Sequence, residues 1–142
     1  MTESLSVRPL PDDWAKQEYC LFLAAIGYEK RARFIAETIA PAARRKGACG
    51  FETQQVLEYQ ANTDWMASHD FDVTHKAEVE FADWLRSQLE KVEVSDGQAK
   101  ILVDISSMTR FRIASAILAI EKHIAFDVVC LASTILPYRR QL

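Results

Sequence analysis

A short stretch after an apolar run combines the side chains that bind phosphate in proteins. Asp104 follows the apolar residues 101–103, and hydroxyl and guanidinium groups come soon after it, on Ser106, Ser107, Thr109 and Arg110. An apolar period of helical type then begins, so we expect a strand, a turn and a helix in this order. A helix start favours anions, because its first backbone N–H groups have no partner within the helix. The stretch 104–110 therefore predicts a phosphate or nucleotide site.

These residues also have a simpler explanation that involves no ligand. Ser107 or Thr109 would serve as the N-cap of the helix, and Asp104 would accept hydrogen bonds from its own turn. Capping does not require a guanidinium group at Arg110, whereas a phosphate site uses one. We therefore favour ligand binding and keep capping as the alternative.

A second loop has the position that a companion binding loop would need. Gly27, Tyr28, Glu29 and Arg31 follow the apolar run 19–26, which has the composition of a strand buried on both faces. Glycine permits close approach of the backbone to a ligand, and Glu29 and Arg31 are suited to hydrogen bonds with a ribose or a phosphate. The alternative is a glycine that merely ends the strand before a charged helical turn.

Hydrophobic periodicity predicts the elements that hold these two loops. Apolar runs predict strands near 19–26, 55–59, 101–103 and 126–132, and helical spacing predicts helices near 29–41, 75–92 and 110–123. Alternating strands and helices indicate an α/β fold, here a Rossmann-like, mostly parallel sheet of about four to five strands with helices on both faces. We expect one domain over residues 1–142, with an irregular N-terminal arm at 1–18. Residues 60–74 show no clear period, and a lid or a short helix remains open there.

Composition limits the classes of partner. The chain has 142 residues, 49% of them hydrophobic, and no apolar run long enough for a membrane helix, so we expect a cytoplasmic protein. A net charge of −3 argues against a protein that coats duplex DNA. Local basic patches still suit a small anion, and they comprise Lys30, Arg31 and Arg33; Arg44, Arg45 and Lys46; Arg110 and Arg112; and Arg139 and Arg140.

Metal and cofactor motifs are not evident. Four potential metal ligands lie within one short stretch, but their spacing matches no recognised metal motif, and we expect a solvated loop at His69, Asp70, Asp72 and His75. The three cysteines have no CxxC spacing, which argues against a zinc site and a disulfide framework. The sequence has no Walker loop, GxGxxG or GxSxG motif, so we expect neither a classical dinucleotide cofactor nor hydrolase chemistry of the elbow type.

The pattern Asp104-x-Ser106-x-x-x-Arg110 after a buried strand resembles the signature loop of the CRISPR-associated Rossmann-fold (CARF) sensor domains. Those domains bind cyclic oligoadenylates and related nucleotides. The resemblance implies that Asp104, Ser106 and Arg110 line the ligand pocket, and that the segment from Gly27 to Arg31 contributes as the first loop. It also implies a homodimer whose paired loops enclose the ligand, in a bacterial antiviral defence system.

The chain departs from that family in one respect and leaves three functions open. Such sensors usually carry a C-terminal effector domain, and none fits after Arg112, so we expect a separate effector protein, a fragment or a stand-alone sensor. Our first hypothesis is a sensor of a cyclic oligonucleotide. The second is an enzyme of the same architecture, a ring nuclease or a nucleotide glycosidase or transferase, in which Asp104 or Glu29 acts on a ribose. The third is an interaction subunit without a ligand.

Overall fold

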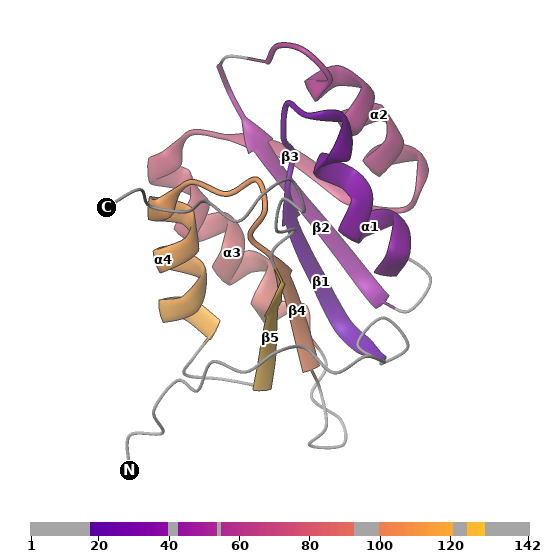
Figure 1. Cartoon of the computed structure of the whole chain (residues 1–142). Coiled ribbons are helices and arrows are strands. Elements are labelled where there is room, and N and C mark those ends of the chain that lie inside the picture. Colours follow the sequence, from indigo (N-terminus) through magenta and orange to yellow (C-terminus); the bar gives the residue numbers. More distant parts are fainter. Residues whose placement is uncertain (1–17, 40–42, 54, 93–99, 121–124, 130–142) are drawn as a thin grey trace, which may run out of the picture.

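The computed structural model describes residues 18–39, 43–53, 55–92, 100–120 and 125–129. They form one parallel sheet of five strands, in the order β3-β2-β1-β4-β5. The strands are β1 (Tyr19–Ala25), β2 (Ala43–Phe51), β3 (Asp72–Lys76), β4 (Lys100–Asp104) and β5 (Ala125–Val129). This arrangement, drawn in Figure 1, confirms the predicted α/β, Rossmann-like fold.

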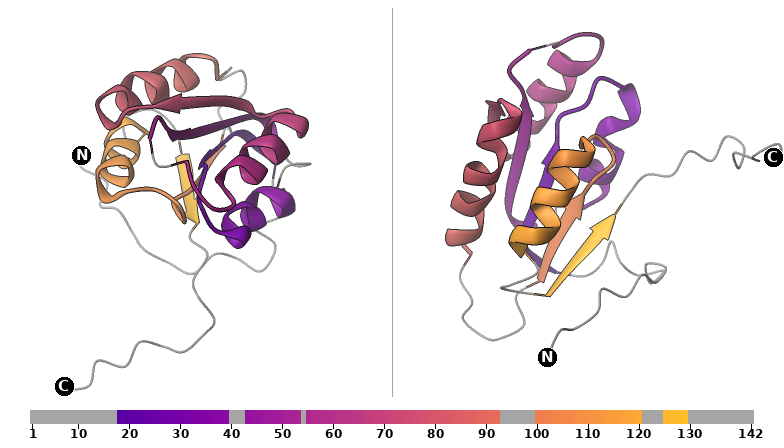
Figure 2. Two further views of the ribbon diagram at one scale, coloured as in Figure 1. Left: turned by 90° about the horizontal axis from the view of Figure 1, so that it is seen from above. Right: turned by 90° about the vertical axis from the view of Figure 1, so that its left-hand side faces the viewer.

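Helices cover both faces of the sheet, as the sequence predicts. The α-helices are α1 (Phe34–Ile39), α2 (Tyr59–Ser68), α3 (Phe81–Glu90) and α4 (Arg110–Ile120), and short 3-10 turns, η2 (Lys30–Arg33) and η4 (Glu78–Glu80), precede α1 and α3. Figure 2 shows α1 and α2 on one face and α3 and α4 on the other. The change of face occurs between β3 and β4, where the chain crosses from one edge of the sheet to the far side of β1.

The central strand β1 is apolar along its length because each of its faces lies under a helical layer. Phe22 packs in one core cluster together with Ile35 of α1 and Met66 of α2. Leu21 and Leu23 point to the opposite face and pack in a second cluster with residues of α3 and α4. All three β1 side chains are fully buried. Each contributes about 1.5 to 3 kcal/mol by leaving water, so β1 is a rigid base for the loop that follows it.

The predicted second strand is wrong in position. The strand is Ala43–Phe51, whereas most of the predicted segment 55–59 is a loop and Tyr59 begins α2. Strand β2 has no continuous apolar run in the sequence, because its first half is exposed and basic and its second half contains glycines. A Cβ at Gly47 would lie 3.0 Å from the amide oxygen of Gln88, and one at Gly50 would overlap the Tyr59 hydroxyl. Both glycines are therefore strand residues that let side chains from the helical layers approach the sheet, and they do not form a turn.

Residues 60–74, for which the sequence predicts no definite element, contain most of α2 and the beginning of β3. Helical periodicity is weak in α2 because only Tyr59, Asn62 and Met66 are buried, and one of these is polar. The helix predicted near 75–92 begins only at Phe81, because β3 continues to Lys76. Its apolar stripe is confirmed, with Phe81, Trp84 and Leu85 buried. Residues 1–17 of the arm predicted at 1–18, and residues 130–132 of the last predicted strand, lie outside the described residues.

Candidate functional site

A cavity of about 460 Å³ lies at the carboxyl end of the sheet. Its walls come from the segments that follow β1, β2, β3 and β4, and the lining residues are Gly27, Tyr28, Glu29, Ala32, Phe51, Thr53, Glu78, Ser106, Ser107, Met108 and Thr109. The strand order changes direction between β1 and β4, which is where open α/β sheets bind ligands. The volume falls within the range of small-molecule sites.

The loop after β4 is shaped by Asp104. This carboxylate is buried, and its Oδ1 accepts hydrogen bonds from the backbone N–H of Ser106 (3.0 Å) and from the Ser106 hydroxyl (2.6 Å). Burial raises the pKa of Asp104 above its usual range, and the two bonds from Ser106 oppose that effect. Asp104 does not line the cavity itself. It holds the turn that brings the following hydroxyl groups to the cavity.

Thr109 is the N-cap of α4. Its hydroxyl oxygen accepts a hydrogen bond from the backbone N–H of Arg112 (3.2 Å), three residues further on, and its hydroxyl donates to Oε2 of Glu78 (2.8 Å). The capping alternatives for Thr109 and Asp104 are thus observed in the structure. Both residues nevertheless belong to the loop that forms the cavity wall.

Ser107 has the hydroxyl group best placed to meet a ligand. It lines the cavity and is half-buried, and within the described part of the chain its hydroxyl makes no hydrogen bond. Ser107 faces Gly27 across the gap between the two loops: a Cβ at Gly27 would overlap the Ser107 hydroxyl and lie 2.9 Å from the Cβ of Ala32. Glycine is therefore required at position 27 for the two loops to approach.

Asn62 fixes the loop after β1 from beneath. Its side-chain amide is buried and donates to two backbone carbonyls, those of Gly27 (3.0 Å) and Glu29 (2.9 Å). The carbonyl of Tyr28, between them, accepts from the backbone N–H of Glu58 (3.0 Å). Three successive carbonyls are held in this way, so the loop has a defined shape before any ligand arrives. The sequence carries no period that would have singled out Asn62.

Arg112 organises the cavity wall around Glu78, whereas the sequence predicts it as part of a local basic patch with Arg110. Its side chain is fully buried. The guanidinium donates to carbonyl oxygens at the ends of β2 and β3, those of Cys49 (3.3 Å), Gly50 (3.0 Å) and Lys76 (2.9 Å). Its Nε donates to Oε1 of Glu78 at 2.6 Å. Arg112 thereby ties two strand ends to the cavity residue Glu78 and to α4, and no ligand contact is needed to explain it.

The buried thiol next to Arg112 is not a reactive cysteine. Cys49 lies in the second half of β2 and is completely buried. Burial raises its pKa to about 11, although the nearby Arg112 guanidinium acts in the opposite direction. A thiolate is the nucleophilic form, so Cys49 is an inert core residue at neutral pH.

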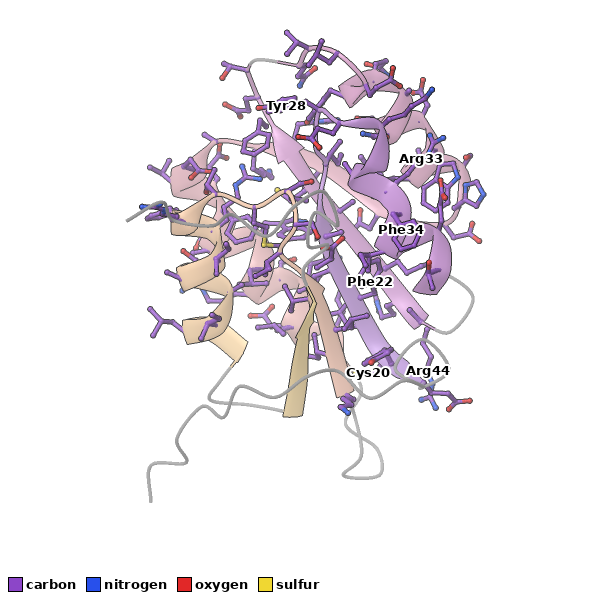
Figure 3. All side chains as sticks on the ribbon, in the orientation of Figure 1. Cys20, Phe22, Tyr28, Arg33, Phe34 and Arg44 are labelled. Atoms are coloured by element: carbon purple, nitrogen blue, oxygen red, sulfur yellow. The ribbon has the colours of Figure 1, made fainter. Side chains whose placement is uncertain are left out.

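The predicted cationic residues are placed differently from the hydroxyl residues. Arg110 is the first residue of α4 and is exposed, and it is not among the cavity-lining residues that the structure describes. The backbone of Arg31 lies in η2 beside the first loop, and its side chain lies outside the described part. The exposed Arg44 is at the amino end of β2, opposite the cavity, as the labels of Arg44 and Tyr28 in Figure 3 show. Arg139 and Arg140 lie outside the described residues.

The loop expected at the four potential metal ligands is wrong for Asp72 and His75, which lie in strand β3, and the surroundings of the four side chains differ. His75 shares a hydrogen bond with the Tyr59 hydroxyl (2.7 Å), His69 stacks on Trp65, and Asp72 accepts from Gln88 (2.9 Å). Asp70 is exposed with a positive φ of 66°. Among the described residues, no three His, Cys, Asp or Glu side chains are grouped to hold a metal ion.

Comparisons with known proteins leave the site to be interpreted from its own geometry. The sequence matches no protein-family model and no curated protein. In the described part of the chain, no helix combines the length and the apolar character needed to cross a membrane. The position of the cavity at the switch point of the sheet makes it the candidate functional site of this chain.

Proposed function

We propose that this chain is a sensor domain that binds a nucleotide second messenger of the cyclic-oligonucleotide type in the cavity between the β1 and β4 loops. The observation that carries the proposal is the Ser107 hydroxyl, which lines the cavity at the start of α4 without a protein partner among the described residues. Hydroxyl groups and free N–H groups at a helix start suit a phosphate oxygen.

The charges on the cavity wall favour a ligand that places one phosphate group in the cavity. The charged residues that line the described cavity are Glu29 and Glu78, and the carboxylate of Glu78 is paired with Arg112. Helix α4 contributes positive potential from its first turn, and the exposed Arg110 adds a cation there. A ligand with one phosphate in this cavity and the rest of its charge outside it suits these surroundings. A cyclic oligonucleotide shared between two copies of the chain has this property.

The finer parts of the proposal come from the resemblance of Asp104, Ser106 and Arg110 to the CARF signature loop. They are a homodimer that encloses the ligand, a separate effector protein, a cytoplasmic location and a role in bacterial antiviral defence. In such a homodimer the same loops of both copies would contact one ligand across a twofold axis.

The experiment is a thermal-shift panel of cyclic oligonucleotides, linear oligonucleotides and mononucleotides, with wild type and Ser107→Ala. A ligand that binds only the folded state raises its stability, so a sensor shows a shift with a cyclic species. Because the Ser107 hydroxyl has no partner in the described chain, Ser107→Ala should keep the unliganded melting temperature. We expect it to weaken binding about tenfold, the value of a hydrogen bond to a charged group.

Two outcomes would redirect the assignment. Chromatography of the same mixtures after long incubation reports turnover, and a new product would make the chain a nucleotide-cleaving or nucleotide-transferring enzyme. No shift with any member of the panel would overturn the proposal and favour an interaction subunit.

A further inference from the structure

One wall of the cavity is aromatic. The rings of Tyr28, in the loop after β1, and Phe51, at the end of β2, both line the cavity. Their centroids lie 5.9 Å apart and their planes are inclined by 23°, so the two rings are stacked. Figure 3 shows Tyr28 at the carboxyl end of the sheet, far from Cys20 and Arg44. The hydroxyl groups of Ser107 and Thr109 come from a different loop of the same cavity.

The aromatic wall is held in place by its own contacts. The Arg112 guanidinium lies over the Phe51 ring at 4.3 Å from its centroid and over Phe81 at 4.9 Å. Tyr28 also contacts Tyr59, with 5.9 Å between ring centroids, and Tyr59 is anchored through its hydroxyl to the backbone of Phe51. Half-buried aromatic rings supported in this way lose little entropy when a ligand stacks on them.

These observations assign the two parts of a nucleotide to two walls. Resting on the proposed function, we infer that Tyr28 and Phe51 form a nucleobase subsite, while the 106–109 loop takes the phosphate. The aromatic wall offers planar apolar surface, which suits an uncharged aromatic base. The Glu78 carboxylate, which lines the same cavity, is paired with Arg112, so its negative charge is largely offset beside the base. A single nucleotide unit therefore spans the cavity, and recognition depends on the base as well as the phosphate.

The test compares two ligands that share a 5-phosphorylated ribose, one carrying a base at C1′ and the other a hydroxyl group. Calorimetric titration of the full chain with adenosine 5′-monophosphate and with ribose 5-phosphate should show at least tenfold tighter binding of the nucleotide. Tyr28→Ala should weaken nucleotide binding about tenfold and leave ribose 5-phosphate binding unchanged, because stacking contributes only where a base is present. Tyr28→Phe keeps the ring and should bind both ligands as wild type does.

The binding of the two ligands distinguishes the base subsite from the phosphate site. Unchanged ribose 5-phosphate affinity in Tyr28→Ala shows that the variant is folded, so a selective loss of nucleotide binding supports the base subsite. Equal affinities of the two ligands for wild type, or an equal loss of both in Tyr28→Ala, overturn the base subsite and leave phosphate binding by the 106–109 loop intact. If wild type binds neither ligand, the base subsite is overturned. If the cyclic oligonucleotides also fail to bind, the proposed function falls with it.

Discussion

The Nε atom of Arg112 lies 2.6 Å from Oε1 of Glu78, joining a completely buried cation to a carboxylate on the cavity wall. The other oxygen of that carboxylate accepts from Thr109, the N-cap of α4. A guanidinium stays charged at any accessible pH. The loop before α3 and the start of α4 are therefore coupled through one buried charge, and the cavity between them depends on it.

Replacing Arg112 should cost more stability than replacing any other described arginine. Arg112→Met keeps much of the side-chain volume, but it removes the guanidinium donor from the carbonyls of Cys49, Gly50 and Lys76 and removes the partner of Glu78. The Cys49 carbonyl keeps a second hydrogen bond, from the backbone N–H of Ile26. We expect a loss of about 3 to 5 kcal/mol in the free energy of unfolding, measured by urea denaturation. Arg110→Ala is the matched control, because this neighbour is exposed, and it should change stability by less than about 0.5 kcal/mol. Similar losses of stability in the two variants would show that Arg112 does not couple the loop before α3 to the start of α4.

Asp104 should make stability depend on pH in a defined direction. Burial raises the folded-state pKa of Asp104 above its ordinary value of 3.8, so its contribution is fully present below that value and is lost as pH rises through the raised pKa. Asp104→Asn stays neutral and keeps an oxygen acceptor for Ser106. Relative to this variant, wild type should therefore lose free energy of unfolding from acid to neutral pH, as measured by urea denaturation at several pH values.

The alanine variant provides the control for Asp104. Asp104→Ala removes both hydrogen bonds from Ser106 and should lower stability by about 1 to 3 kcal/mol. If the free energy of unfolding of wild type instead rose relative to that of Asp104→Asn between acid and neutral pH, the predicted direction of the pH dependence would be wrong.

Gly27→Ala should force apart the two loops of the cavity. The added Cβ would lie 2.9 Å from the Cβ of Ala32 and overlap the Ser107 hydroxyl. Overpacking of this kind costs about 1 to 3 kcal/mol, read from the urea midpoint. The double variant Gly27→Ala/Ser107→Gly removes the clash with Ser107 and should recover part of the loss. No recovery would show that the strain lies elsewhere, for example against Ala32 alone.

The sequence predicts the fold better than it predicts individual elements. Strands β1 and β4 are buried on both faces, so their apolar runs are continuous and their positions follow from the sequence. Strand β2 carries Arg44 and Arg45 at its exposed amino end and glycines where side chains of α2 and α3 press on it, so tertiary packing decides its structure. Helix α2 has a polar buried residue, Asn62, which erases the apolar period.

The candidate site was also predicted in part, because some of its residues follow from their position in the chain and others from tertiary packing. Position in the chain predicts the loops after β1 and β4, because the carboxyl ends of parallel strands share one edge of the sheet. Seven of the residues named from sequence lie in these two loops with described side chains, namely Gly27, Tyr28, Glu29, Asp104, Ser106, Ser107 and Thr109. Phe51 and Glu78 were missed, and Arg112 was named only as part of a basic patch, since the meeting of these three residues depends on contacts across 34 or more positions of the chain. A hint existed in Arg112, which is the one charged residue among positions 111–120 of α4.

The most direct test of nucleotide binding in the cavity is a map of backbone amide shifts by heteronuclear NMR during titration with the cyclic oligonucleotide that gives the largest thermal shift. We predict that the largest changes fall on the amides of Gly27–Glu29 and Ser106–Thr109, while those of the basic stretch Arg44–Lys46 at the other end of β2 stay in place. Changes centred on Arg44–Lys46, with the two loops unaffected, would contradict the account.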